Sequence, residues 1–151
     1  GGGQEFNLRG GTENTAAIAG MGLAAKIATN KLKQTRMHLN KLEIFFKSEL
    51  MKIFPRVIFN ENVESKLPGL VSVSFPKNKS SILLAKLDRL DISVSNGSAC
   101  GSGIIKPSKI LSAMGIEDDL NLSTLRISFG IKNTIKEIND LLSALNSILV
   151  K

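Results

Sequence analysis

Cysteine and histidine are almost missing from this sequence, because its 151 residues contain one of each, Cys100 and His38. A single cysteine excludes an internal disulfide, and one cysteine with one histidine excludes the usual Cys/His zinc sites. We therefore expect no metal site. The scarcity of cysteine also matches a reducing, cytosol-like compartment, so we expect a cytoplasmic protein.

Large aromatic residues and long apolar runs are scarce too. Tryptophan and tyrosine are absent, and no apolar run reaches the roughly 18–20 residues that a membrane span needs. The lysines behind the net charge of +7 are spread along the chain and form no basic run. We therefore expect no membrane association and no specific nucleic-acid partner. The basic surface is predicted to be solvated or to meet an acidic partner.

What is present is the composition of a folded domain. Hydrophobic residues make up 42% of the sequence and charged residues 22%, so the chain is predicted to bury one core. It starts with three glycines in place of methionine, which indicates a processed chain, a cloned piece or a fragment.

Apolar residues at three-, four- and seven-residue spacings run from Glu13 almost to Pro55. They predict one long bent helix or two consecutive helices, with Thr12 as the N-cap. Further helices are expected from an N-cap at Ser80, from Lys106-Pro107 to just before Gly115, and from a capping box at Thr134–Glu137 toward the C-terminus. Strands are expected at 56–59, 70–75, 92–94 and 125–129.

These segments predict an α+β, two-layer domain in which helices cover a small, mostly antiparallel sheet. The long N-terminal helix is its most extended element. Small residues fill the first half of this helix between Ala16 and Ala25, which predicts close packing on another element.

The main candidate for chemistry is Cys100. It lies in a stretch where apolar and polar residues alternate from Ile92 and small residues then follow. Small and flexible neighbours would leave the thiol uncovered on a mobile loop. They are Gly97, Ser98, Ala99, Gly101 and Gly103. Lys106 and Lys109 follow closely and would favour a thiolate. A lone cysteine is more often a small buried hydrophobe, so both interpretations stay open at this point.

Two other stretches carry binding chemistry. Arg126 lies in an alternating strand, on the face opposite Leu125 and Ile127. Such an arginine is either a solvated strand residue or a bidentate clamp for a carboxylate. Gly10-Gly11-Thr12 precedes a helix, where free amides favour an anion, although an ordinary helix cap fits as well. For His38 we expect an exposed position on the helix.

Four separated motifs occur in the order of a known family. They are Gly1-Gly2-Gly3-Gln4-Glu5, Arg9-Gly10-Gly11-Thr12-Glu13-Asn14, Ser95-Asn96-Gly97-Ser98-Ala99-Cys100 and Leu125-Arg126-Ile127-Ser128-Phe129-Gly130. In these motifs the chain resembles the C-terminal part of a cysteine desulfurase, a class V aminotransferase-like enzyme of fold type I that uses pyridoxal phosphate. It is similar to the subgroup with the longer cysteine loop, and the resemblance covers essentially the whole chain.

The resemblance implies a role for each candidate. Cys100 would attack the sulfur of the substrate L-cysteine and carry it as a persulfide, with release of L-alanine. Arg126 would hold the substrate α-carboxylate. Thr12 would reach the phosphate of the pyridoxal phosphate in the opposite subunit of a homodimer. The sulfur would then pass to acceptor proteins, such as an iron–sulfur scaffold, for cluster or thio-cofactor assembly.

The resemblance also implies that part of the machinery lies elsewhere. The cofactor lysine of the family follows a histidine in a motif before the glycine-rich start, whereas His38 is followed by Leu39. Residues 1–12 would be the end of the cofactor domain or its linker, and residues 13–151 the small C-terminal domain with its long linking helix. The chain alone would then be inactive. Lys106 departs from the family, whose members usually carry an acidic residue there.

Two alternatives remain at the level of sequence. The first is a non-catalytic module that serves dimerisation or the docking of sulfur acceptors, and slow labelling of a buried Cys100 would favour it. The second is a selenocysteine lyase or cysteine sulfinate-type relative on the same scaffold. Substrate kinetics would separate this second alternative from a cysteine desulfurase.

Overall fold

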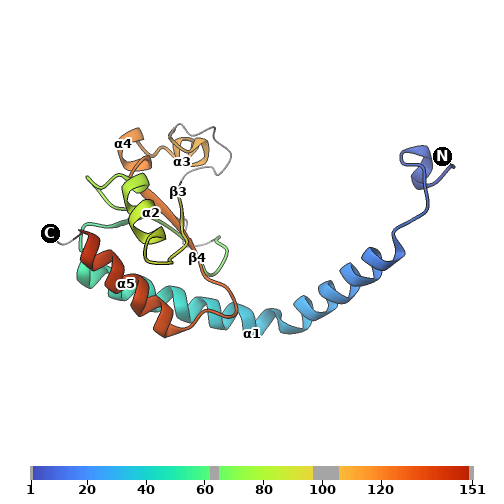
Figure 1. Ribbon diagram of the computed structural model, residues 1–151, viewed down its shortest axis with the longest axis horizontal. Helices are drawn as coiled ribbons and strands as arrows, with labels where there is room; N and C mark the ends of the chain where they lie inside the picture. The colour runs from blue at the N-terminus through green and yellow to red at the C-terminus, as the bar shows by residue number, and fades with distance from the viewer. Residues whose placement is uncertain (1, 62–64, 97–105, 150–151) are drawn as a thin grey trace. The chain divides into compact units, whose positions relative to one another are not determined.

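The computed structural model describes residues 2–61, 65–96 and 106–149 (Figure 1). Its elements follow in chain order. They are the 3₁₀ turn η1 (Glu5–Asn7), α1 (Thr15–Ile53), β1 (Ile58–Phe59), β2 (Leu70–Ser74), α2 (Ser80–Asp88), β3 (Ser95–Asn96), α3 (Lys109–Ala113), α4 (Asp118–Asn121), β4 (Thr124–Ser128) and α5 (Ile135–Leu149).

The four strands form one antiparallel sheet in the order β1-β2-β4-β3. The central pair is β2 and β4, with Val71 opposite Ile127 and Val73 opposite Leu125. These four side chains are buried and share one face, as the two-residue period of a strand requires. The opposite face of β4 carries exposed Arg126 and Ser128.

The core lies on the face of the sheet that carries these apolar side chains, under three helices. The second half of α1, α2 and α5 all contribute buried residues to the same cluster. They include Leu42, Phe46 and Leu50 from α1, Leu83 and Leu87 from α2, and Ile138, Leu141, Leu142 and Leu145 from α5. The α+β, two-layer prediction with a long N-terminal helix is therefore confirmed. We refer to the other side of the sheet, which carries Arg126, as the outer face.

The chain divides into two compact units, Gly1–Thr35 and Arg36–Lys151, with the boundary inside α1. In the first unit the apolar side chains of α1, such as Met21 and Leu23, are exposed. Its small residues are exposed as well, so the described residues do not supply the close packing that we predicted for them. The domain boundary after residue 12 stays a prediction.

Three helix starts differ from the sequence prediction. Asn14, not Thr12, caps α1, because its Oδ1 accepts the N–H of Ala17 at 3.1 Å. Ser80 is not an N-cap either. It lies inside α2 as a buried residue whose hydroxyl donates to the carbonyl of Leu122 at 2.7 Å. Pro107 precedes α3, which starts at Lys109.

The edge strand next to β4 also differs from the prediction. The alternating apolar residues at 92–94 are not in the sheet, which instead takes Ser95 and Asn96. Ile92 and Val94 are partly buried against the core, and the amide of Ile92 donates to the carbonyl of Leu87 at 3.0 Å. Their alternation therefore reflects packing beside α2 and not ladder pairing.

The capping box at the start of α5 is confirmed. The N–H of Thr134 donates to Oε2 of Glu137 at 2.8 Å, and the N–H of Glu137 donates to the hydroxyl of Thr134 at 3.4 Å. The hydrogen bond from the backbone of Thr134 is the main cause that lowers the pKa of Glu137 below its ordinary value.

Because of this capping box, the free energy of unfolding should depend on pH in the acid range. Because the folded state prefers the ionised carboxylate, Glu137 stabilises the fold above its ordinary pKa, and the contribution is lost as pH falls through the lower pKa of the folded state. We expect Glu137→Gln to be less stable than the parent at pH 7 and nearly equal to it at strongly acid pH. Urea unfolding at both pH values measures this. A difference that stays constant between them would contradict the prediction.

Candidate functional site

Arg126 lies at the middle of β4, on the outer face of the sheet. Its cross-strand neighbours are Ser72 on β2 and Ser95 on β3. The flanking residues Leu125 and Ile127 are buried on the other face. The sequence therefore placed the arginine on the correct face, and the ladders on both sides of β4 hold its backbone.

The guanidinium of Arg126 has one hydrogen-bond partner among the described residues. Its Nη2 donates to Oγ of Ser95 at 3.2 Å. Within those residues no carboxylate forms a salt bridge with Arg126. Arginine carries five N–H donors in a planar fork, so most of them remain available to an incoming carboxylate. Arg126 therefore has the chemistry of an anion-binding residue.

Cys100 lies outside the described residues, as do Gly97, Ser98, Ala99, Gly101 and Gly103, for which a mobile loop was predicted. The residues on either side of this segment are held firmly. Before it, Asn96 pairs with Leu125 of β4. After it, the buried side chain of Asn121 accepts the N–H of Ser108 at 2.8 Å and donates to the carbonyl of the same residue at 3.0 Å. The role of Cys100 stays a prediction.

Thr12 is exposed and lies three residues before the start of α1. Its side chain has no hydrogen-bond partner in the described part of the chain. A free hydroxyl fits a phosphate oxygen in its chemistry. Thr12 belongs to the first compact unit and Arg126 to the second, so each is described within its own unit.

His38 is not the exposed residue that the helical pattern predicted. It is half-buried, and its Nε2–H donates to the carbonyl of Asn133 at 3.0 Å. The hydrogen bond joins α1 to the loop before α5. We missed it because Asn133 lies 95 residues further along the chain, and a helical pattern carries no information about such a partner.

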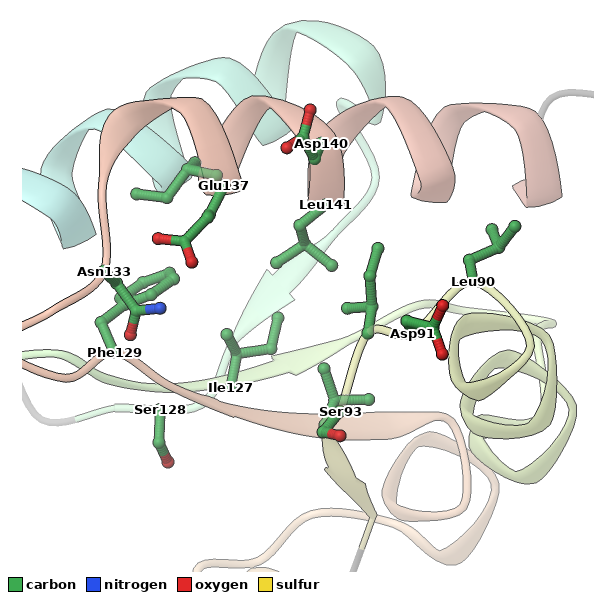
Figure 2. Close-up of a pocket in the computed structure, with 13 residues that line it drawn as sticks. Leu90, Asp91, Ser93, Ile127, Ser128, Phe129, Asn133, Glu137, Asp140 and Leu141 are labelled. Carbon is green, nitrogen blue, oxygen red and sulfur yellow. The ribbon is translucent and has the colours of Figure 1, made fainter.

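A groove of about 590 Å³ is bordered by residues 90–94, the C-terminal end of β4 and the first turns of α5 (Figure 2). Its size falls within the range of ligand pockets. Figure 2 shows Leu141 pointing down from α5 and Ile127 pointing up from β4. Three acidic residues, Asp91, Glu137 and Asp140, also line the groove, and their negative charge would repel a substrate carboxylate. It is therefore a poor site for an amino acid.

The described residues lack two further kinds of feature. No group of three or more metal-binding side chains occurs in the ranges that the structure covers. Among the helices in those ranges, none has the length and apolar character needed to cross a membrane.

Known proteins resemble this chain in sequence and in fold. The cysteine desulfurase IscS of Dictyoglomus turgidum is 34% identical over 151 residues, which is 100% of this chain and 38% of that protein. A cysteine desulfurase of Homo sapiens is 33% identical over 139 residues, 92% of this chain and 30% of that protein. A solved structure of a NifS-like protein from Rickettsia africae has a TM-score of 0.85 at 31% identity, covering 100% of this chain and 39% of that one.

The matched relatives are all longer than this chain. It spans about 38% of the length of the Dictyoglomus relative. The family model described as aminotransferase class-V matches residues 3–141, which is most of the sequence. With the four motifs, the antiparallel sheet and the match over the full chain in agreement, this chain belongs to the aminotransferase class-V family.

Proposed function

We propose that this chain is the C-terminal small domain of a cysteine desulfurase. In this proposal residues 13–151 form that domain, and residues 1–12 are the end of the cofactor domain or its linker. The observation that carries the proposal is the position of Arg126. Its side chain is exposed at the middle of β4, a strand paired on both sides, and it has no carboxylate partner among the described residues. The relatives named cysteine desulfurase support the same assignment.

Arg126 would bind the α-carboxylate of L-cysteine through its planar fork, as two parallel N–H···O bonds. In the sequence, the lone cysteine follows soon after the strand that pairs with β4. Asn96 pairs with the residue next to Arg126, and four residues of extended chain span at most about 14 Å. This short separation in sequence supports the proposal that Cys100 acts on a substrate held by Arg126.

Cys100 would act as the nucleophile. Its thiolate attacks the substrate sulfur, an S–S bond forms, and the carbon–sulfur bond of the substrate breaks. The electron pair of the broken bond stays with the substrate carbon, which takes up a proton to give L-alanine. The product on the protein is the persulfide of Cys100, and no external oxidant or reductant is needed.

Pyridoxal phosphate would supply the electron sink for this carbon when it is bound. Thr12 fits a contact with its phosphate, as an exposed hydroxyl close to the start of a long helix. In our proposal that cofactor belongs to the opposite subunit of a homodimer. The lysine that binds it would come from outside this chain. In the family this lysine follows a histidine, whereas His38 is followed by Leu39 and its ring is hydrogen-bonded to Asn133.

The persulfide would be passed to acceptor proteins, such as an iron–sulfur scaffold, in a reducing compartment like the cytoplasm. The non-catalytic docking module is not favoured, because the relatives that cover this chain are named as desulfurases. A preference for selenocysteine stays an alternative that substrate kinetics would decide.

The test of this proposal is turnover by the full-length protein with bound pyridoxal phosphate. We expect L-cysteine to give alanine and sulfide in equal amounts in the presence of a reductant. Arg126→Gln should raise KM for L-cysteine by about 10- to 100-fold, the effect of losing hydrogen bonds to a charged group. Arg89→Gln, at the C-terminal end of α2, is the matched control and should leave KM unchanged. An Arg126→Gln enzyme with the parent KM would overturn the carboxylate role.

A further inference from the structure

Among the described residues, Ser95 is the hydrogen-bond partner of the Arg126 side chain, and the function proposed above gives it no role. We propose that Ser95 is a positioning residue, which orients the guanidinium of Arg126 and thereby sets the selectivity of the site for ligands that carry a carboxylate. This inference rests on the proposed function, because it assumes that Arg126 binds the substrate.

The geometry of β3 and β4 supports this role. Ser95 and Arg126 are directly opposite each other in an antiparallel pair, so their side chains project from the same face of the sheet. Oγ of Ser95 accepts a hydrogen bond from Nη2 of Arg126 at 3.2 Å. Ser95 itself is half-buried, and the ladder fixes its backbone. A short side chain on a held strand is a rigid acceptor for a long and flexible donor.

The contact matters because a free arginine side chain has many rotamers. Fixing one N–H of the fork leaves fewer orientations for the remaining donors, so less conformational freedom is lost when a carboxylate binds. The same hydrogen bond leaves the other donors of the guanidinium available. Ser95 would therefore act on the carboxylate through Arg126 and not by touching the substrate.

Ser72 shows that a nearby hydroxyl is not sufficient. It lies opposite Arg126 on the other side, in β2, and it is half-buried like Ser95. In the described structure its hydroxyl makes no hydrogen bond with Arg126. The arginine is therefore turned toward β3, the strand that leads into the segment with Cys100. The two serines form a matched pair for a test.

The experiment uses the full-length enzyme with bound pyridoxal phosphate and four substitutions at these two positions. Ser95→Ala and Ser95→Val remove the hydroxyl, and Val has the shape of Thr. Ser95→Thr restores the hydroxyl on a side chain that strands favour. Ser72→Ala is the control. The readouts are KM and kcat for L-cysteine, with inhibition constants for two probes. 3-Mercaptopropionate carries a carboxylate and no amine, whereas cysteamine carries an amine and no carboxylate.

We expect Ser95→Ala and Ser95→Val to raise KM and the inhibition constant of 3-mercaptopropionate by about 3- to 10-fold, the effect of one ordinary hydrogen bond. The inhibition constant of cysteamine and kcat should stay at the parent values. Ser95→Thr and Ser72→Ala should behave like the parent enzyme. Val and Thr have the same shape, so a difference between them isolates the hydroxyl.

Two outcomes would overturn the positioning role. In the first, the Ser95 variants bind 3-mercaptopropionate like the parent. In the second, they weaken both probes equally or lower kcat, as general damage to the fold would. Arg126→Gln separates these outcomes from a failure of the proposed function. If that variant weakens 3-mercaptopropionate and the Ser95 variants do not, only the Ser95 inference fails. If it has no effect, the carboxylate role of Arg126 fails as well.

Discussion

Replacing Glu43 with alanine should destabilise this chain by about 3–5 kcal/mol, the usual effect of removing one partner from a buried ion pair. Glu43 lies on α1 between Leu42 and Phe46 of the core, and only 2% of its surface is exposed. Urea unfolding of the parent and the variant, followed by circular dichroism, measures the difference in the free energy of unfolding.

The reason for this large effect is the set of groups that Glu43 satisfies. Its Oε1 accepts hydrogen bonds from the amines of Lys47 and Lys66, and its Oε2 accepts the backbone N–H of Gly69 at 3.0 Å. Both lysines also contact Glu61. Without the Glu43 carboxylate, one remaining carboxylate faces two cations, and the Gly69 amide loses its acceptor. A buried donor without a partner is costly in itself.

Glu49 provides the matched control, because it is another glutamate of α1 in an ion pair with a lysine. The pair joins Glu49 to Lys52, whose side chain is 68% exposed. Exposed pairs of this kind contribute little, so Glu49→Ala should change the free energy of unfolding by less than about 1 kcal/mol. If Glu43→Ala were as mild as Glu49→Ala, our account of the buried cluster would be wrong.

The Glu43 cluster also supports the strand that carries the candidate site. Gly69 has a φ of +81°, a backbone conformation that favours glycine. Its carbonyl accepts the N–H of Phe129 at 2.8 Å, and the next residue, Leu70, starts the pairing of β2 with β4. Glu43 therefore stabilises the position of Gly69, next to the first residue of β2 that pairs with β4, the strand of Arg126.

Local patterns predicted most of the architecture of this domain. The spacing of apolar residues located α1 and α5, alternation located β2 and β4, and the Thr134–Glu137 pair located the start of α5. Each of these signals lies within one element or at its end. They were sufficient because an amphipathic helix or strand buries the face that its own sequence makes apolar.

Partners that lie far apart in the chain could not be predicted. A glutamate on a helix is normally exposed, and the residues that bury Glu43 include Gly69, which lies 26 positions away. In the sequence, Ser95 stands out only as part of the motif around the cysteine. Its pairing with Arg126 depends on the register of β3 on β4, which is a tertiary property that the sequence does not show. Alternation could place Arg126 on the outer face, but only the register showed which serine it contacts.

Replacing Cys100 with serine should have the largest effect on activity. We expect formation of the protein persulfide to fall to background, and turnover of L-cysteine to fall at least about 1,000-fold, as is typical when a nucleophile is removed. Serine cannot substitute, because its hydroxyl stays protonated near neutral pH and cannot form a persulfide. Mass spectrometry of the full-length protein after a single turnover measures the gain of one sulfur atom on the peptide that contains residue 100.

The Cys100 and Arg126 variants should fail in different ways, and this difference is the strongest test of the roles proposed for them. Cys100→Ser should bind 3-mercaptopropionate like the parent and lose sulfur transfer, whereas Arg126→Gln should bind it weakly and keep the nucleophile. Ser102→Ala, a change of one neighbouring hydroxyl in the same stretch, should retain both properties. Sulfide release by Cys100→Ser at the parent rate would show that another group takes the sulfur. Because Cys100 is the single cysteine of this chain, that group would then lie in the part of the protein outside it.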